Sequence, residues 1–266
     1  LRVTPAQEGK LSATLCMTAP ATNADGTKLE NLSSITISRG DKQIKTIEAP
    51  EPGSEITYTD NEANQGYNTY NVYCTNAHGN SEVESQKAYI GLDVPTAVRE
   101  LTAKRNKDLS ITLSWVAPAS SVNGGYYATD DVKYNVYHDG ETLVQSSETS
   151  YTYIPKETEQ RIYEFTVEPE VTFGCGTDTI SNKIISGTPI QPTYKESFAN
   201  GGTDNIPWCQ DTKIADFKWF STDSSEFEQE PYDNDNGMLV AKAEYAFNGE
   251  KSRIMTPIFD LSNMTN

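Results

Sequence analysis

The sequence is poor in the residue types on which catalysis and cross-linking most often depend. Its 266 residues include 2 histidines, 4 cysteines and 3 tryptophans. The histidines, His78 and His138, are far apart, and no Gly-x-Ser-x-Gly, His-Glu-x-x-His, Cys-x-x-Cys or phosphate-binding glycine-rich motif occurs. Carboxylates are abundant, but no predicted barrel or groove brings two of them face to face. We therefore expect a protein without enzymatic activity.

Positive charge and long apolar runs are also scarce. Lysine and arginine number 21 against 38 aspartates and glutamates, which gives a formal net charge of -17. Such a surface repels phosphate backbones, so nucleic acid is not an expected partner. No apolar stretch has the length of a membrane span, so insertion of this segment into a membrane is not expected. The acidity itself fits two interpretations, solubility or the binding of cations.

The few cysteines do not form a disulfide framework. Cys16 falls between Leu15 and Met17, whose side chains we expect to point inward, so its own side chain should point outward. The others, Cys74, Cys175 and Cys209, are spread over different parts of the chain, and no pair has metal-ligand spacing. We expect mostly or entirely free thiols.

An internal repeat is the main feature that the sequence does contain. The segment Leu11–Ala21 returns with few changes as Leu109–Ala119. In both copies apolar and polar residues alternate, which is typical of a β-strand with one buried face, and an Ala-Pro pair ends each strand. A repeat of about a hundred residues indicates two copies of one folding unit.

Each copy contains a series of short predicted strands separated by turns rich in Gly, Pro, Asn and Asp. In the first copy the strands are expected at 13–18, 34–38, 44–47, 56–59, 69–75 and 83–90. In the second copy they are expected at 110–116, 133–137, 142–145, 150–154, 162–168 and 180–185. No segment between them has a helical period, so both copies are predicted to be antiparallel sandwiches.

The spacing of aromatic residues in the second copy resembles that of a fibronectin type III domain. The residues concerned are Leu113, Trp115, Pro118, Tyr134, Val136, Tyr137, Tyr163, Phe165, Val167, Gly174 and Ser181. In that family the Trp of the second strand and the Tyr of the sixth fill the space between two sheets. The first copy is similar but has Met17 in place of the Trp, while Tyr70, Val72, Asn76 and Gly79 keep the later pattern. The resemblance covers roughly residues 1–188 and implies two immunoglobulin-like sandwiches.

A third region follows the Pro-containing segment 187–192. Its landmarks are Glu196-Ser-Phe198, Trp208, Asp216-Phe-Lys-Trp219, Asp233-Asn-Asp-Asn-Gly237 and Ser252-Arg-Ile-Met-Thr-Pro257. Their order resembles MAM domains and the choice-of-anchor or cleaved-adhesin jelly rolls of bacterial surface proteins. The region has about half the length such a sandwich needs. We expect a partial jelly roll that can self-associate through open strand edges, with a small complete β-unit as the alternative.

The tripeptide Arg39-Gly40-Asp41 invites a comparison with integrin-binding motifs. Aligned on the repeat, it occupies the same place as His138-Asp139-Gly140, between two adjacent strands. Glycine beside aspartate is what a tight hairpin turn requires. We therefore expect a turn at this position and no integrin site.

Calcium is the cation that the third region could hold. Asp233 and Asp235 alternate in an acidic turn before Gly237, and calcium prefers several carboxylate oxygens together. The resemblance to MAM-like domains adds Glu196 and Asp216 to the set. A solvated acidic turn without metal is the alternative.

Exposed aromatic side chains are candidates for stacking on sugar rings. Four are expected on or near loops of the second copy, Tyr126, Tyr127, Tyr151 and Tyr153, and two more, Trp219 and Tyr232, lie in the third region. The alternative is that these tyrosines simply populate strands and half-exposed turns.

The predicted fold class is therefore all-β, with two tandem fibronectin type III-like sandwiches at 1–92 and 93–189 and a partial jelly roll at 190–266. The resemblances imply a secreted bacterial protein or cell-surface protein for adhesion or ligand binding, with an extracellular glycan or protein as partner. The alternative is an accessory, non-catalytic region of a secreted polysaccharide-degrading enzyme or protease. A third interpretation makes the modules passive spacers.

Overall fold

The computed structural model describes residues 1–192, 194–196, 198, 208–212, 219–223, 237–241 and 249–264, and for 209–212 and 220–223 it describes the backbone alone. Over these residues the fold is all-β, as predicted, with one 3-10 turn, η1, at Thr129–Asp131. The chain forms two compact units. The first comprises Leu1–Ala97, Pro118–Lys133 and Glu168–Thr177, and the second Val98–Ala117, Tyr134–Val167 and Asp178–Asn266.

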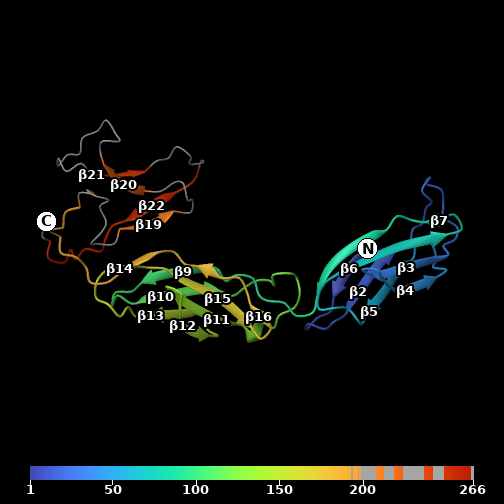
Figure 1. The fold of residues 1–266 in the computed structure, drawn as a ribbon, viewed down its shortest axis with the longest axis horizontal. Coiled ribbons are helices and arrows are strands. Elements are labelled where there is room, and N and C mark those ends of the chain that lie inside the picture. The colour runs from blue at the N-terminus through green and yellow to red at the C-terminus, as the bar shows by residue number, and fades with distance from the viewer. Residues whose placement is uncertain are drawn as a thin grey trace. The chain divides into compact units, whose positions relative to one another are not determined.

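The first sandwich consists of two antiparallel sheets (Figure 1). One sheet has the order β1-β2-β5, formed by Arg2–Pro5, Ala13–Thr18 and Glu55–Asp60. The other has the order β4-β3-β6-β7 with β8 also paired to β6, formed by Lys42–Glu48, Ser34–Arg39, Gly66–Asn76, Gly79–Asn80 and Glu84–Ile90. This is the strand arrangement of a fibronectin type III-like sandwich.

Alternation along the strands builds the core of this sandwich. In β2 the side chains of Leu15 and Met17 are buried, while Cys16 between them is half-exposed and lies beside Thr57 on the outer face. The prediction that Cys16 points outward is confirmed. Residues of both sheets meet in one apolar cluster, whose fully buried members include Leu15, Ile35, Ile37, Tyr70 and Ile90.

The second sandwich repeats this plan. One sheet has the order β13-β10-β9, formed by Ser150–Tyr153, Ile111–Val116 and Arg99–Arg105. The other has the order β12-β11-β15-β16 with β17 paired to β15, formed by Glu141–Ser146, Lys133–His138, Phe165–Val171, Gly174–Cys175 and Thr179–Ile180. A further pair joins β14, Arg161–Tyr163, to β18, Ile184–Ser186.

Detailed features of the two sandwiches match. Each has a register shift at the same place in its third and fourth strands, between Ile37 and Ser38 and between Val136 and Tyr137. The resemblance implied that Trp115 and Tyr163 fill the space between the sheets, and both are buried. The Trp115 ring makes an edge contact with that of Tyr134, with centroids 5.4 Å apart.

The predicted strands all overlap strands of the structure, but the first strand of each sandwich was not predicted. These are β1 and β9, at Arg2–Pro5 and Arg99–Arg105. In β9 the only strongly buried residue is Ala103, and charged residues surround it. The alternation was too weak to reveal a strand whose pairing with β10 is its main stabilisation.

Within the first unit, the segment that follows β8 is fixed by a buried carboxylate. Asp93 is 1% exposed, and its side chain accepts hydrogen bonds from the backbone N–H groups of Val94, Asn123 and Gly125 and from the Asn123 amide, at 2.7–3.0 Å. Burial by itself would raise the pKa of Asp93, but these hydrogen bonds lower it. A Cβ on Gly125 would lie 2.6 Å from the Tyr89 ring, so only glycine fits there.

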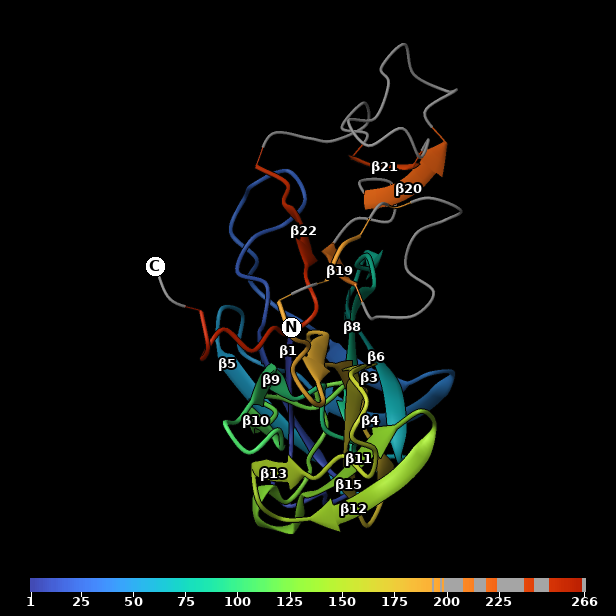
Figure 2. The ribbon, with the colours of Figure 1, turned by 90° about the vertical axis from the view of Figure 1, so that its left-hand side faces the viewer.

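The third region contributes two short strand pairs to the second unit (Figure 2). Cys209–Thr212, β19, pairs with Ser252–Met255, β22, and Trp219–Asp223, β20, pairs with Gly237–Ala241, β21. The Gln160 side chain both donates to and accepts from the backbone of Ile258, each at 2.8 Å. The jelly roll itself, and its self-association, stay predictions.

Candidate functional site

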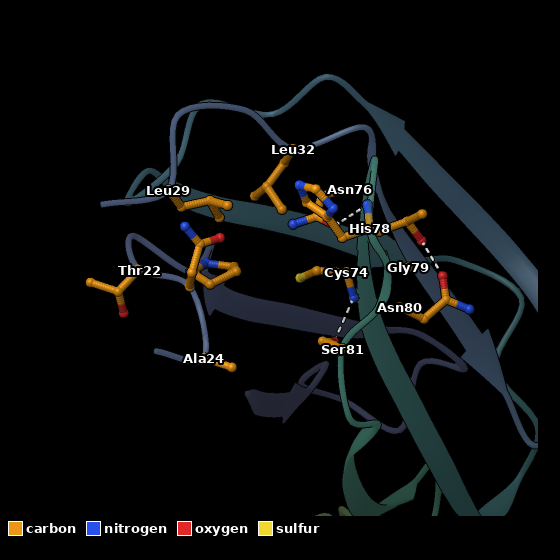
Figure 3. A pocket seen from close by; sticks show the side chains of 13 residues that line it. Thr22, Ala24, Leu29, Leu32, Cys74, Asn76, His78, Gly79, Asn80 and Ser81 are labelled. Carbon is orange, nitrogen blue, oxygen red and sulfur yellow. Dashed lines mark hydrogen bonds between the residues drawn. The ribbon is translucent and has the colours of Figure 1, made fainter. Parts of the chain in front are cut away.

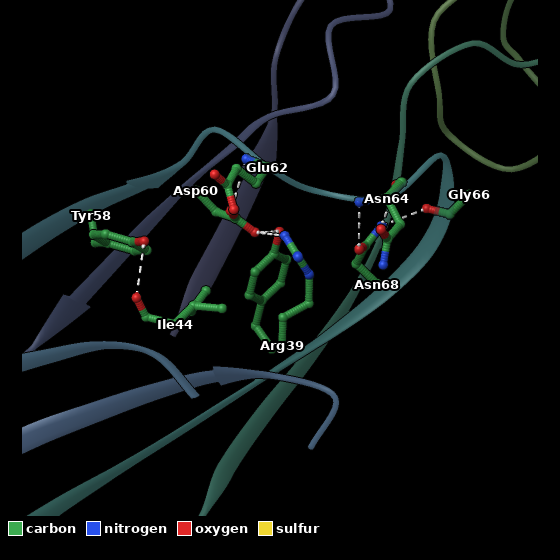
Figure 4. Close-up of polar contacts among 9 residues, drawn as sticks. Arg39, Ile44, Tyr58, Asp60, Glu62, Asn64, Gly66 and Asn68 are labelled. Carbon is green, nitrogen blue, oxygen red and sulfur yellow. Dashed lines mark hydrogen bonds and ion pairs between the residues drawn. The ribbon is translucent and has the colours of Figure 1, made fainter. Parts of the chain in front are cut away.

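The Arg-Gly-Asp tripeptide lies in the turn between β3 and β4, as predicted, and its arginine is used by the fold. The Arg39 guanidinium donates to a carboxylate oxygen of Asp60 at 2.6 Å (Figure 4). Their side chains are 10% and 4% exposed. Gly40 has a φ of 56°, the left-handed conformation that favours glycine in a turn. An arginine held in this way is not available to a receptor.

The carboxylate of Asp60 is fully hydrogen-bonded. One oxygen accepts from Arg39 and from the Tyr70 hydroxyl, the latter at 2.9 Å, and the other accepts from the backbone N–H of Glu62 at 3.0 Å. Burial, followed by the bond to Asp60, raises the pKa of Tyr70 far above its ordinary value. This network ties the edge of one sheet to the centre of the other, so its role is structural.

The predicted calcium ligands are described only in part. Glu196 accepts a hydrogen bond from the backbone N–H of Phe198 at 2.9 Å and a short one from the Tyr194 hydroxyl. Asp216, Asp233 and Asp235 lie outside the described residues. Among the residues that are described, no group of three or more His, Cys, Asp or Glu side chains could hold a metal ion. The calcium site stays a prediction.

The predicted stacking aromatics lie at different places. Tyr151 and Tyr153 are on β13, and Tyr126 and Tyr127 precede η1. All four are half-buried, and the Tyr127 hydroxyl donates to the carbonyl of Pro118 at 3.3 Å. Trp219 begins β20, and Tyr232 lies outside the described part of the chain.

A groove of about 240 Å³ lies at one end of the first sandwich (Figure 3). The long loop between β2 and β3 forms one side, and the β6–β7 turn with the segment after it forms the other. Leu29 and Leu32, each 6% exposed, connect its lining to the hydrophobic core. Burial raises the pKa of the Cys74 thiol, so at neutral pH this part of the lining is uncharged.

The hydrogen bonds of the turn set the polar side of the groove. The Asn76 side chain accepts from the backbone N–H of His78, and Asn80 accepts from the Thr75 hydroxyl, both at 2.8 Å. The amide nitrogens of Asn76 and Asn80 donate to no residue that the structure describes. None of the thirteen lining residues is an aspartate, glutamate, lysine or arginine. In a chain with a net charge of -17, a groove without any carboxylate, lysine or arginine side chain is a distinct local environment.

The sequence interpretation missed this groove. The sequence pattern places Asn76 and Gly79 in a fibronectin-like series of residues and gives no role to His78, which lies between them. Their common location follows from the fold, since the β2–β3 loop and the β6–β7 turn are more than forty positions apart in the sequence. The one available signal was the number of asparagines in both segments.

The strand arrangement defines a tandem of fibronectin type III-like modules. No family model and no curated protein matches the sequence. Among solved structures, the FN1–FN3 domains of chicken CNTN1 are similar at 12% identity with a TM-score of 0.33, over 97% of this chain and 87% of that chain. Domains A168–A170 of titin are similar at 17% identity with a TM-score of 0.30, over 69% of this chain and 61% of that chain. Within the described residues, no helix is long and apolar enough to cross a membrane.

Proposed function

We propose that this chain is a non-enzymatic, modular segment of an extracellular or cell-surface protein that serves adhesion or ligand binding. In this role the sandwiches act as spacers, and the groove at the end of the first sandwich holds the ligand. The observation that supports the proposal most directly is the lining of this groove, which is polar, uncharged and incompletely hydrogen-bonded. Concave surfaces with a few convergent polar groups and an apolar floor are typical binding sites.

A short, uncharged polar segment of an extracellular protein is the ligand that fits this lining best. Asparagine side chains carry both donors and an acceptor, which matches the N–H and C=O groups of a peptide backbone. No tyrosine, tryptophan or phenylalanine lines the groove, so the face of a sugar ring has no large aromatic partner there. Leu29 and Leu32 offer apolar surface to one small side chain of the peptide.

Peptide selection on the full chain tests this role. A displayed library of random peptides is selected against the protein, and the affinity of the selected peptides is measured by calorimetry. The double variant Asn76→Ala/Asn80→Ala is expected to bind about tenfold more weakly, because each lost hydrogen bond weakens binding several-fold. The matched control is Asn61→Ala, at an exposed asparagine away from the groove. Peptides that bind the double variant as tightly as the native chain would contradict the proposal.

The third region adds a separate part to this proposal, supported by its sequence alone. A MAM-like or cleaved-adhesin-like jelly roll that binds calcium through Glu196, Asp216, Asp233 and Asp235 would stabilise the end of the segment. Thermal melting with added calcium and with a chelator tests it. A melting temperature that is the same under both conditions would exclude the calcium site and leave the groove unaffected.

A further inference from the structure

The second sandwich has a cleft of its own, where the β11–β12 turn meets the connection from β13 to β14. Its volume of about 310 Å³ lies at the lower end of the range for small-molecule sites. Four parts of the second unit line it: the β11–β12 hairpin with His138, Asp139 and Glu141, the end of β13 with Tyr153, the connection with Lys156 and Glu157, and β14 beginning at Arg161. The loops concerned differ from those that form the groove of the first sandwich.

Aromatic rings contribute one wall of this cleft. The rings of Tyr153 and Tyr163 are 5.7 Å apart, and that of His138 lies 5.5 Å from the first and 5.3 Å from the second. The Nδ1 atom of His138 is 3.0 Å from the carbonyl oxygen of Glu164. Because a carbonyl can only accept, Nδ1 must carry the proton, and this bond fixes the orientation of the imidazole. The wall is therefore preorganised before any ligand arrives.

Two tyrosine hydroxyls at this wall are not used by the fold. Tyr163 is 4% exposed, yet its hydroxyl forms no hydrogen bond with any residue in the described ranges, and the same holds for Tyr153. Neither hydroxyl oxygen is among the buried polar atoms without a partner in the described part of the chain, so both are accessible to a ligand or water that can supply the bond. Burial raises the pKa of both tyrosines, so both hydroxyls remain donors at neutral pH.

The charges around the cleft exclude a strongly charged ligand. Asp139, Glu141 and Glu157 come from two different segments and would repel an anion, whereas Lys156 and Arg161 would repel a cation. Arg161 and Glu157 already pair with each other. A neutral molecule with hydroxyl groups can accept from the lysine and the tyrosines and donate to the carboxylates.

We infer that this cleft binds one ring of a neutral saccharide. The apolar face of the ring packs against the aromatic wall and Ile162, and its hydroxyls bond to Tyr153, Tyr163, Lys156 and Glu141. At this site tyrosine rings, hydroxyls that the fold does not use and charges of both signs line a common cavity. The inference extends the proposed ligand-binding role to a second site whose chemistry differs from that of the groove.

The test uses the full chain and defined sugars. Cellobiose, maltose and lactose are titrated by calorimetry and by saturation-transfer NMR, with glucuronic acid and glucosamine as charged comparators. At least one neutral disaccharide is expected to bind saturably and more tightly than both comparators. Tyr163→Phe and Lys156→Ala are each expected to weaken that binding about three- to tenfold, the effect of losing one hydrogen bond. Tyr163→Phe removes a hydroxyl without a partner in the fold, so its melting temperature should not fall.

Matched variants separate this site from the rest of the molecule. Tyr73→Phe and Lys104→Ala alter the same residue types outside the cleft and should leave sugar binding unchanged. The double variant Asn76→Ala/Asn80→Ala should also leave it unchanged, while the cleft variants should not affect peptide binding to the groove. The inference is overturned if no neutral disaccharide binds, if a charged comparator binds more tightly, or if the cleft variants bind sugar like the native chain.

Discussion

The two sandwiches fill the same end of their cores with different side-chain contacts, which are ionic in the first sandwich and aromatic in the second. In the first, an ion pair and a tyrosine hydroxyl form a closed polar network between Arg39, Asp60 and Tyr70. In the second, the equivalent positions are taken by His138, Tyr153 and Phe165, whose ring centroids lie 5.1–5.5 Å apart.

The strand registers establish this equivalence. Arg39 and His138 are the last residues of β3 and β11, each just beyond a register shift. Asp60 and Tyr153 pair with the first residue of β2 and β10, respectively. Tyr70 precedes the last paired residue of β6, where the chain turns to β7. Phe165 precedes the last paired residue of β15, where the chain turns to β16, by the same number of residues.

The difference between these two solutions has a functional consequence. In the ionic network both oxygens of the Asp60 carboxylate and the Tyr70 hydroxyl are already hydrogen-bonded within the fold. The aromatic cluster packs ring against ring and leaves two hydroxyls and a cleft beside it. A position that only stabilises one copy of a repeat can therefore become a binding surface in the other copy.

The largest expected effect comes from opening the ionic network. Asp60→Ala leaves the Arg39 guanidinium and the Tyr70 hydroxyl buried without their shared acceptor, which should cost about 3–5 kcal/mol of unfolding free energy. Urea denaturation of the full chain measures it, and the loss should fall in the transition of the first unit. A cost below about 1 kcal/mol would show that the network is dispensable.

A change at the equivalent place in the second sandwich should cost less. His138→Phe keeps a ring among Tyr153, Tyr163 and Phe165 but loses the hydrogen bond to the Glu164 carbonyl. The expected cost is about 1 kcal/mol, the net value of one ordinary hydrogen bond. Measured by the same denaturation, a cost equal to that of Asp60→Ala would erase the contrast between the two cores.

Acid should weaken the first unit through Asp93. Since hydrogen bonds lower its pKa in the folded protein, the carboxylate stabilises the fold at neutral pH, and this stabilisation is lost as the pH falls below its ordinary value of 3.8. Melting curves between pH 7 and pH 2.5 should show a smaller acid-induced loss in Asp93→Asn than in the native chain. Parallel curves for the two proteins would contradict this role of Asp93.

The smallest effect is expected at the exposed end of the tripeptide. Asp41 lies in the turn that corresponds to Asp139-Gly140 of the second sandwich. Asp41→Ala should leave the melting temperature unchanged, because Asp41 is exposed and the turn conformation depends on Gly40. Cell attachment to the immobilised chain should also be unchanged. Loss of integrin-dependent attachment would show that the motif is recognised despite the buried arginine.

The sequence was sufficient to predict what depends on local alternation. The strand Ala13–Thr18 was predicted with its observed bounds, and the turn at Gly40 was predicted from its repeat partner. The strand β9 was missed because Ala103 is its only strongly buried residue, and its pairing with β10 leaves no alternation in the sequence. Its neighbour β10 was found because Ile111, Leu113 and Trp115 alternate with polar residues.

The candidate sites were harder to predict because they depend on contacts between distant segments. The sequence predicts His138 beside a hairpin turn and Tyr163 in the core, and the structure confirms both. Nothing in either local pattern indicates that the two rings lie 5.3 Å apart beside a cleft. Similarly, no local pattern indicates a partner for Arg39, since Asp60 lies on the other sheet, more than twenty residues further along the chain.

The hydrogen bonds of Asp93 give the first unit an order of assembly. During synthesis, β8 is complete at Ile90, but the partners of the Asp93 carboxylate are in place only after Gly125 has been added. A shortened chain ending near residue 92 would thus have every strand of the first sandwich and still lack its last buried anchor. The first copy of the repeat therefore ends in the sequence about one loop before the point at which this unit becomes fully stable.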